Sequence, residues 1–296
     1  MNRYLFEILC YIQKNGEKEY SIRDISDSIN ISGNTVIKWV QYAVDNGLLN
    51  KKDELLSVSD KGILELEPYR VKKAVILAAG FGSRLLPATS DKPKPLVSVN
   101  GKKIIETLLD SLMSVGIDDI IIVRGYKKDK FDELLVKYPF IKFIDNNRYD
   151  RENNISSVIA ALDEIDGCYL CEADLYISNS NIITRYQYSS NILGAYSLET
   201  DDWSFKMLDG YISDYKKGNT YCYNYYGISY WTAEDSKKLR LDWKDIYLKN
   251  KDVFWEEVPL IYKKENYKVE IRQCLKSDVM EIDNYYELAE LDHSYR

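Results

Sequence analysis

Histidine and long apolar runs are both scarce in this sequence, and each shortage argues against a class of protein. The only histidine among 296 residues is His293, near the end of the chain, which argues against histidine-based catalysis and against a histidine-rich metal site. No apolar run approaches the roughly 20 residues that a membrane-spanning helix needs. Charges interrupt the first residues, unlike a signal peptide. We therefore expect a cytoplasmic protein with no membrane partner.

Cysteine is present but scattered, and the charge balance is acidic. The five cysteines include one C-x-x-C pair, Cys168 and Cys171, in a stretch with strand character. Residues three apart on a strand point to opposite faces, so we interpret the pair as reduced structural thiols rather than a redox or zinc site. The net charge of −7 disfavours non-specific binding to nucleic acid.

A candidate phosphate-binding loop follows a short apolar segment. Residues 74–79 are apolar and partly β-branched, which is typical of a strand buried on both faces of a parallel sheet. In the next segment, 80–84, two glycines allow a sharp turn and bring N–H groups close to an anion. Arg84 adds a cationic fork suited to phosphate oxygens, and Lys94 lies between two prolines that stiffen its backbone. Together these features predict a polyphosphate site.

The loop fits one of three known phosphate-binding patterns. It lacks the Gly-Lys-Ser/Thr of a P-loop, and Leu85 stands where a dinucleotide-binding fold needs a third glycine. The nucleotidyltransferase pattern Gly-x-Gly-Ser/Thr-Arg-x-x-Pro-x-Thr, followed by Pro-Lys, is complete. Its fixed positions are Gly80, Gly82, Ser83, Arg84, Pro87, Thr89, Pro93 and Lys94. The segment therefore resembles the nucleotidyltransferase family.

Two domains are predicted, residues 1–70 and residues 71–296. The first shows three helical patterns followed by a small hairpin, and so resembles a winged helix-turn-helix domain. The second alternates strands with helices, which predicts an α/β, Rossmann-like fold with a mostly parallel mixed sheet. The expected strands are 74–79, 120–123, 141–144 and 168–173, and the expected helices are 102–115, 127–137 and 154–162.

The partner of the N-terminal domain stays open between two alternatives. A DNA-binding winged helix would present Ser32, Asn34, Thr35, Lys38 and Gln41 to the groove, and these residue types fit. The domain holds nine Lys/Arg against eleven Asp/Glu, a net charge of −2, which disfavours DNA. The alternative is a winged helix that mediates domain contacts or a homodimer. Titration with duplex DNA at low salt separates the two.

Carboxylates and a capped helix follow the later strands. Asp174 comes just after a buried strand that ends near Glu172, and ligands of open α/β sheets lie beyond the carboxyl ends of strands. We therefore expect Asp174 to face the glycine loop and to hold Mg²⁺. The helix that opens near Asn154 offers N–H groups, amides and hydroxyls to a base or ribose. The expected nucleotide contacts are Leu77, Ala78, Ala79, Gly80, Gly82, Ser83, Asn154 and Ser157.

Three tryptophans lie next to acidic residues. Trp203 follows Asp201-Asp202, Trp231 precedes Glu234-Asp235, and Trp255 precedes Glu256-Glu257. Aromatic faces together with carboxylates are how proteins hold quaternary ammonium groups. The alternative is that these tryptophans are core residues.

From residue 73 to about 291 the chain resembles the bacterial CTP:phosphocholine cytidylyltransferases of the nucleotidyltransferase superfamily. The matching segments are 80–97, 116–123, 153–154, 172–174, 203, 227–231, 254–256 and 281–283. The resemblance implies transfer of CMP from CTP to phosphocholine, giving CDP-choline and pyrophosphate. The acceptor oxygen would attack the α-phosphate in line, and Mg²⁺ would offset the developing charge.

The resemblance also implies roles for single residues. Arg84 would hold the leaving phosphates and Lys94 would bridge the α-phosphate and the acceptor, with Lys216 a weaker candidate for the acceptor phosphate. Asp174 would be the first metal ligand, and Glu256 or else Asp252 the second. The choline pocket would comprise Trp203 and Trp255, with Tyr230 and Trp231 nearby.

Two other functions are weighed against this one. A sugar-1-phosphate nucleotidyltransferase shares the glycine loop, although a sugar pocket would want more amides and hydroxyls than tryptophans. A regulator would bind DNA through the winged helix and sense CTP or CDP-choline through an idle transferase domain. The intact Arg84, Lys94 and Asp174 argue against idleness.

Overall fold

The computed structural model describes residues 1–296. It divides them into two compact units: residues 1–70 with 186–188, and residues 71–185 with 189–296. The short segment 186–188, far along the chain, was not expected in the first unit. None of the helices combines the length and the apolar character that crossing a bilayer requires.

The first unit consists of four helices and a three-stranded sheet of order β1-β3-β2. Its elements are α1 Arg3–Asn15, β1 Lys18–Glu19, α2 Ile22–Ile29, α3 Gly33–Asp45, β2 Leu49–Lys52, β3 Leu55–Val58, α4 Asp60–Leu66 and the 3-10 turn η1 Glu67–Tyr69. Ser21 and Ser32 cap α2 and α3 by accepting hydrogen bonds from the backbone N–H groups of Asp24 and Thr35. The predicted helices and hairpin are therefore present in this unit.

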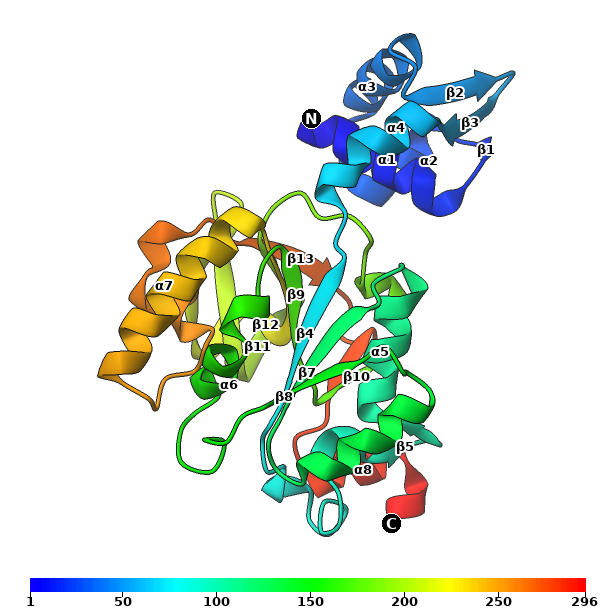
Figure 1. Ribbon diagram of the computed structural model, residues 1–296. Helices are drawn as coiled ribbons and strands as arrows, with labels where there is room; N and C mark the ends of the chain where they lie inside the picture. Colours follow the sequence, from blue (N-terminus) through cyan, green and yellow to red (C-terminus); the bar gives the residue numbers. More distant parts are fainter. The chain divides into compact units, whose positions relative to one another are not determined.

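The second unit is built on a seven-stranded sheet of order β11-β13-β12-β9-β4-β7-β8 (Figure 1). Its strands are β4 Lys73–Ala78, β7 Asp119–Arg124, β8 Lys142–Asp145, β9 Cys168–Glu172, β11 Asn191–Leu208, β12 Tyr211–Trp231 and β13 Glu270–Cys274. Strand β4 pairs in parallel with β7 and β9, and β7 pairs in parallel with β8. Strand β12 runs antiparallel to β9 and forms a long hairpin with β11. The predicted α/β fold with a mostly parallel mixed sheet is confirmed.

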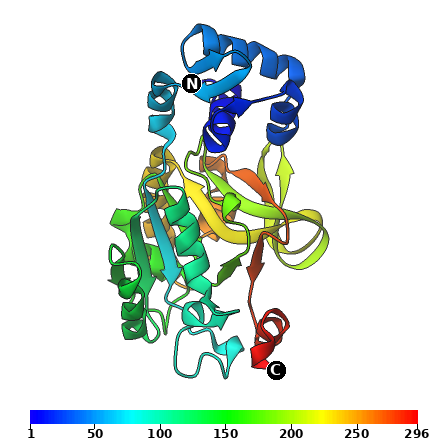
Figure 2. The same cartoon turned by 90° about the vertical axis from the view of Figure 1, so that its right-hand side faces the viewer.

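Helices cover both faces of this sheet, with α5 on one side and α6 and α7 on the other (Figures 1 and 2). The helices are α5 Ile104–Ser114, α6 Ile155–Ala160, α7 Ala233–Lys249 and α8 Tyr285–Leu291, and the short strands are β5 Ser98–Val99, β6 Lys102–Lys103, β10 Leu175–Ile177 and β14 Val279–Glu281. The short helical segments are η2 Ser83–Leu85, η3 Lys94–Leu96, η4 Lys128–Val136, η5 Leu162–Glu164, η6 Ser180–Ile182, η8 Lys264–Asn266 and η9 His293–Tyr295, all of 3-10 type, and the π-helix η7 Val258–Tyr262.

The helix predicted over 127–137 is instead the 3-10 segment η4, Lys128–Val136. Only Phe131 and Leu134 of this segment are buried, so little packing favours α-helical geometry over the tighter 3-10 turn.

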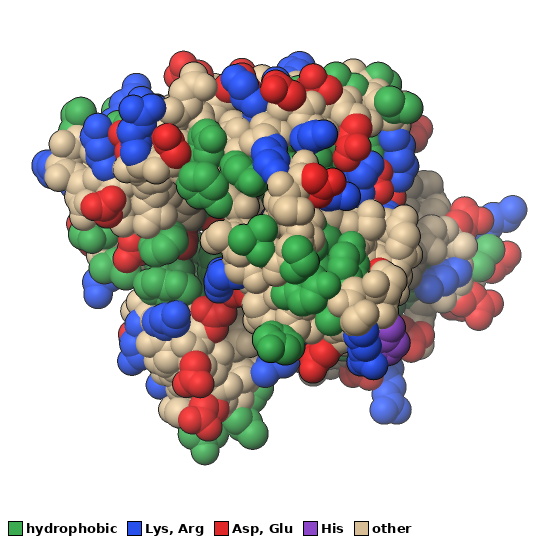
Figure 3. Space-filling model, turned by 90° about the horizontal axis from the view of Figure 1, so that it is seen from below, with side chains coloured by type: hydrophobic (Ala, Val, Ile, Leu, Met, Phe, Trp, Pro, Cys, Tyr) green, Lys and Arg blue, Asp and Glu red, His purple; other side chains and the backbone are tan.

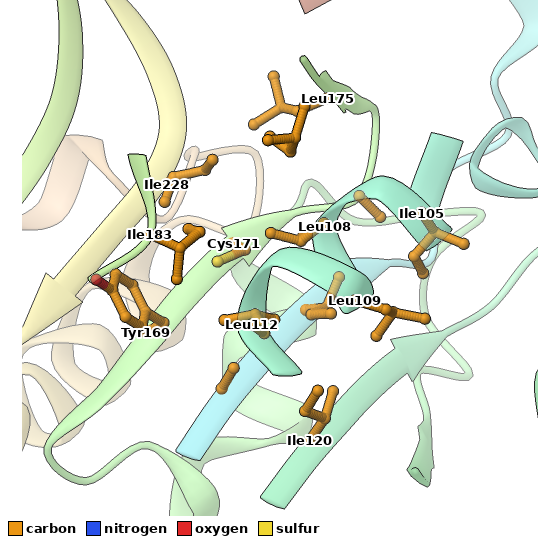
Figure 4. Packing of buried hydrophobic residues seen from close by; sticks show 14 of the residues in the cluster. Ile105, Leu108, Leu109, Leu112, Ile120, Tyr169, Cys171, Leu175, Ile183 and Ile228 are labelled. Carbon is orange, nitrogen blue, oxygen red and sulfur yellow. The ribbon is translucent and has the colours of Figure 1, made fainter. Parts of the chain in front are cut away.

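Strand β4 contributes core side chains to both faces of the sheet. Ala74 and Ile76 belong to a cluster with Leu108 of α5, and Figure 4 shows α5 packed over the strands in this cluster. Val75 belongs to the cluster on the opposite face. The predicted strand, buried on both faces, is therefore confirmed, and it delivers its loop from a rigid support.

The two thiols of the C-x-x-C pair lie on opposite faces of the sheet, as predicted. Cys171 is in the cluster with α5 and Cys168 is in the other cluster. Both are free and buried, and burial raises the pKa of Cys168 to about 12. They are packing residues.

Candidate active site

A cleft of about 590 Å³ lies at the carboxyl ends of β4 and β9. Figure 3 looks at the molecule from below, where β4 of Figure 1 runs into its loop, and shows a recess with both acidic and basic side chains at its edge. The cleft is lined by all of the predicted nucleotide contacts: Leu77, Ala78, Ala79, Gly80, Gly82, Ser83, Asn154 and Ser157. The sequence signals that placed them were the glycine-loop motif after a buried strand for residues 77–83 and the start of a capped helix for Asn154 and Ser157.

Gly82 explains why the glycine loop and Lys94 occur together. Gly82 has a left-handed backbone with φ of 62°. A Cβ atom added to it would lie 2.6 Å from Cβ of Lys94, so no side chain fits there. The Thr89 hydroxyl donates a 3.0 Å hydrogen bond to the Gly82 carbonyl and holds the turn from behind. The loop is therefore closed onto Lys94 by local packing.

The two cations of the loop are paired with carboxylates across the cleft. Nη1 and Nη2 of Arg84 donate to the two carboxylate oxygens of Asp283 at 3.1 and 2.9 Å. Nζ of Lys94 lies 3.0 Å from Oδ2 of Asp174 and 3.5 Å from Oδ1 of Asp283. Burial opposes ionisation of Asp174, but the charge and hydrogen bond of Lys94 outweigh it and hold the pKa of Asp174 below its usual value. The lysine and the aspartate are both charged.

Three carboxylates converge beside these cations. Oxygens of Asp174, Glu281 and Asp283 lie within 4.8 Å of one another, and Oδ1 of Asp174 is buried with no hydrogen-bond partner. Burial and the charges of the two aspartates raise the pKa of Glu281 well above its usual value. The negative charge of the three carboxylates is therefore only partly balanced by the neighbouring cations. Clustered carboxylate oxygens are the ligands that Mg²⁺ prefers, and the set fits this ion.

The second metal ligand expected from the sequence is corrected by this geometry. The acids that join Asp174 are Glu281 and Asp283, rather than Glu256 or Asp252. Asp252 does not line the cleft, and its backbone carbonyl accepts from the side chain of Asn153. A position beside Trp255 does not bring Glu256 or Asp252 into the cluster with Asp174, whereas β14 pairs with β10, which begins three residues after β9 ends, and so brings in Glu281.

A second group of acids and aromatic side chains lines the other part of the cleft. Glu172, Glu256 and Tyr225 line it, and the hydroxyl of Tyr215 donates to Oε1 of Glu256 at 3.3 Å. Burial, with the neighbouring charge of Glu257, raises the pKa of Glu256 to about 7. Burial and the charge of Glu256 also raise the pKa of Glu172. We call Glu172, Glu256, Tyr215 and Tyr225 the acidic pocket. Its two carboxylates do not belong to the three-carboxylate cluster that could hold a metal ion, and neither is paired with a lysine or an arginine.

Asn154 connects the nucleotide side of the cleft with the acidic pocket. Its Oδ1 accepts a 2.8 Å hydrogen bond from the backbone N–H of Trp255, which fixes the residue before Glu256. On the same helix, Ser157 accepts from the side chain of the buried Asn146 at 3.1 Å. The two predicted nucleotide contacts are thus also held in place by the fold.

Of the four predicted acceptor-binding aromatics, only Trp203 lines the cleft. Trp231 and Trp255 have no exposed surface, and Tyr230 is buried. The rings of Trp231 and Trp255 pack edge-to-face with centroids 6.4 Å apart, and Nε1 of Trp231 donates to Ser229. These three residues pack in the core and do not line the cleft, which does not fit the prediction that they contact the acceptor. Burial raises the pKa of Tyr230 to about 12.

Lys216 does not line the cleft, whereas the next residue, Lys217, does. The Lys216 ammonium lies 3.1 Å from Asp214, with about half of its side chain exposed. Lys217 lines the cleft and pairs across the hairpin with Trp203. Alternation along β12 puts one lysine inward and one outward. The β11–β12 hairpin contains bulges that shift its register, so the sequence alone could not show which of the two lysines points into the cleft.

A protein-family model described as nucleotidyl transferase matches residues 73–203. The chain is 37% identical over 228 residues to the 2-aminoethylphosphonate cytidylyltransferase of Lancefieldella rimae, covering 75% of this chain and 92% of that protein. It is 32% identical over 234 residues to the choline-phosphate cytidylyltransferase of Streptococcus pneumoniae, covering 74% of this chain and 96% of that protein.

Solved structures of nucleotidyl-transferring enzymes are also similar to this chain. The CTP:phosphocholine cytidylyltransferase of Streptococcus pneumoniae superimposes with a TM-score of 0.71 at 30% identity, covering 77% of this chain and all of that one. The inositol-1-phosphate CTP transferase of T. maritima superimposes with a TM-score of 0.61 at 16% identity, a likeness of fold alone.

Proposed function

Because the chain belongs to the nucleotidyltransferase family and is a cytidylyltransferase within it, we propose that it transfers CMP from CTP to a small acceptor that carries both a phosphorus acid group and a positive charge. Phosphocholine and 2-aminoethylphosphonate are both acceptors of this kind. The observation that supports this class is the acidic pocket, which shares one cleft with Arg84, Lys94 and the glycine loop.

The phosphate end of the cleft supplies positive charge from two side chains that ion pairs hold in place. Lys94 is buried and its pKa is raised, because the carboxylate of Asp174 outweighs the opposing effect of burial. Arg84 is more exposed, with 69% of its side chain accessible, and pairs with Asp283, which Lys94 also approaches. In the proposed reaction Arg84 binds the leaving phosphates and Lys94 the α-phosphate and the acceptor oxygen. Both act by positioning and charge, with no nucleophilic side chain.

The metal-binding residues of the proposal are Asp174, Glu281 and Asp283. Mg²⁺ bound there would neutralise charge on the phosphates. The protein itself holds two of these carboxylates, Asp174 and Asp283, in place through Lys94 and Arg84, so these cations and acids are mutually oriented before substrate binds.

The acceptor end favours a cation over a sugar. An uncharged sugar would leave Glu172 and Glu256 without a counter-charge, and uncompensated buried carboxylates are costly. Trp203, whose ring also lines the cleft, would offer an aromatic face to phosphocholine, the acceptor expected from the sequence, as it would to any other cationic acceptor. A single aromatic face suffices for a cation–π contact.

Pyrophosphate release tests the proposed function. The full-length protein would be incubated with CTP, UTP, ATP or dTTP, Mg²⁺ and one of four acceptors: phosphocholine, phosphoethanolamine, 2-aminoethylphosphonate or glucose 1-phosphate. We expect release with CTP and the cationic acceptors. A Lys94→Ala preparation is the blank that excludes a contaminating enzyme. Efficient turnover of glucose 1-phosphate, with none of the cationic acceptors, would refute the proposal.

A further inference from the structure

The acidic pocket contains buried polar atoms that lack a partner. Glu256 is 3% exposed; its Oε1 accepts from Tyr215, but its Oε2 has no hydrogen-bond partner. The hydroxyl of Tyr225, a residue that is 9% exposed, is also buried without a partner. Both residues line the cleft. Buried polar groups in folded proteins are almost always paired, so these two atoms indicate a ligand with hydrogen-bond donors.

Gly227 keeps room for the third oxygen-bearing group, Glu172. A Cβ atom added to Gly227 would lie 2.2 Å from Oε2 of Glu172. The backbone of Gly227 is not in the left-handed region that favours glycine, so its lack of a side chain is needed for space alone. β12 thus leaves a place for the Glu172 carboxylate against the strand that also carries Tyr225.

Two of the three basic residues that line the cleft are engaged elsewhere, and the third, Lys217, forms no ion pair with the acids of the pocket. Lys94 is bonded to Asp174 and Arg84 to Asp283, and none of the ion pairs of the structure includes Glu172 or Glu256. The pocket therefore offers negative charge and acceptor oxygens that no ion pair of the protein engages. A ligand that suits it carries a positive charge and several N–H donors.

We propose that Glu172, Glu256 and Tyr225 bind the ammonium group of a primary amine and select it over a trimethylammonium group. A primary ammonium has three donors, which matches the two carboxylates and the phenol oxygen. A trimethylammonium group has the charge but no donors, so Oε2 of Glu256 and the hydroxyl of Tyr225 would stay unpaired. This inference rests on the proposed function, since it concerns the acceptor of that reaction.

The aromatic side chains do not form the alternative site, a cage for a quaternary ammonium. Such a cage needs several free ring faces. Trp231 and Trp255 are fully buried, and one face of Trp203 is stacked on Tyr215 with ring centroids 4.9 Å apart. Phe254 also packs against Trp203, with ring centroids 6.0 Å apart at an interplanar angle of 65°. One tryptophan face is left for an acceptor.

The test compares two acceptors that differ only in methylation: 2-aminoethylphosphonate and its N,N,N-trimethyl counterpart. Full-length protein, CTP and Mg²⁺ are held constant, and kcat/KM is measured for each by pyrophosphate release. We expect the primary amine to be favoured by about tenfold or more. In Glu256→Gln and Tyr225→Phe that ratio should fall towards one, through loss of the primary amine rather than gain of the trimethyl compound.

Two further variants make the result specific. Gly227→Ala changes no charge but displaces Glu172, and should lower the ratio in the same direction. Glu234→Gln, at an exposed position on α7, is the matched control and should leave the ratio unchanged. Circular dichroism identifies any variant that does not fold. If Glu256→Gln or Gly227→Ala fails in this way, the conclusion is drawn from Tyr225→Phe, which removes only one oxygen atom.

The outcomes separate this inference from the proposed function. If the trimethyl acceptor is used as well as the primary amine or better, or if the ratio survives in both Glu256→Gln and Tyr225→Phe, the inference is overturned while cytidylyl transfer stands. If neither acceptor supports pyrophosphate release from CTP, and phosphocholine and phosphoethanolamine also fail, the proposed function is lost and this inference with it.

Discussion

The cleft contains two groups of carboxylates whose surroundings differ. Asp174 lies 3.0 Å from the ammonium of Lys94, and its pKa is held below the usual value despite burial. Glu256 accepts from the hydroxyl of Tyr215 and lies near the amide of Asn154, but it has no cation beside it, and burial raises its pKa to about 7. Both acids line one cleft. The difference shows that the neighbouring cation, rather than the depth of burial, decides which acid is charged before any ligand binds.

The same contrast separates two acids that are close in sequence. Glu172 and Asp174 are two positions apart at the end of β9. The first meets Gly227 of β12 and the second meets Lys94. One strand end therefore supplies an acid to each group, and we propose that the two groups serve the metal and the acceptor respectively.

The largest expected effect is that of Asp174→Asn, which acts on the group beside Lys94. The amide keeps the shape but loses the charge that binds a hard cation, and it leaves the buried Lys94 ammonium with a weaker partner. We expect turnover to fall by roughly a hundredfold or more. The rise in melting temperature produced by Mg²⁺ with CTP should also disappear.

The matched control for this variant is Asp163→Asn, at an exposed position outside the cleft. It should leave both readouts unchanged. Turnover within a few fold of the parent at low millimolar Mg²⁺ would show that Asp174 is not a metal ligand, and would remove the distinction between the two groups of acids.

Much of the phosphate side could be predicted because its information is local. The glycine loop and Lys94 lie within one short segment, and the strand before them has an unmistakable buried pattern. Gly82 must pack on Lys94, so the spacing itself encodes the contact. Asp174 could be predicted because carboxyl ends of parallel strands meet at one edge.

The rest of the site depends on contacts between distant segments, which spacing does not encode. Glu281 comes to Asp174 through the pairing of β14 with β10. Lys217 faces the cleft because of bulges in the β11–β12 hairpin. Trp255 is a core residue because Trp231 and Trp243 pack around it, and an acidic neighbour in sequence gives no sign of that.

A smaller effect, on stability, is expected from Glu256→Gln in the other group. In the folded protein the pKa of Glu256 is raised from 4.5 to about 7, so the folded state binds the proton more tightly than the unfolded state. Stability from this group is therefore full below pH 4.5 and is lost as the pH rises through about 7. Glutamine carries no charge, so the substitution removes the cost of burying the ionised carboxylate, a cost that is present only at high pH.

The variant should thus melt higher than the parent at pH 8 and nearly equally at pH 5. The gain corresponds to about 1–3 kcal/mol, or roughly 2–6 °C. The groups that face Glu256 are Glu172, Tyr215, Tyr225, Glu257 and Asn154. Because none of them is a cation, the sign is set by burial. An equal or lower melting temperature at pH 8 would mean that Glu256 has an unseen positive partner, and the contrast with Asp174 would fail.

The smallest expected effect belongs to Trp203, which borders the acidic pocket without hydrogen-bonding to it. One face of its ring is already stacked on Tyr215, so at most one cation–π contact with the acceptor is available. At about 0.5–1 kcal/mol for a partly exposed site, Trp203→Ala should raise the KM for the acceptor by roughly two- to fivefold. The KM for CTP should not change, because the glycine loop and α6 make the expected contacts with the nucleotide.

Trp231→Phe is the matched comparison: that ring is fully buried, so its loss should lower the melting temperature through a core cavity and leave both KM values unchanged. If Trp203→Ala instead raised the KM for a trimethylammonium acceptor by a hundredfold, the aromatic face would be the main recognition element. The carboxylates of the acidic pocket would then serve only to set its charge.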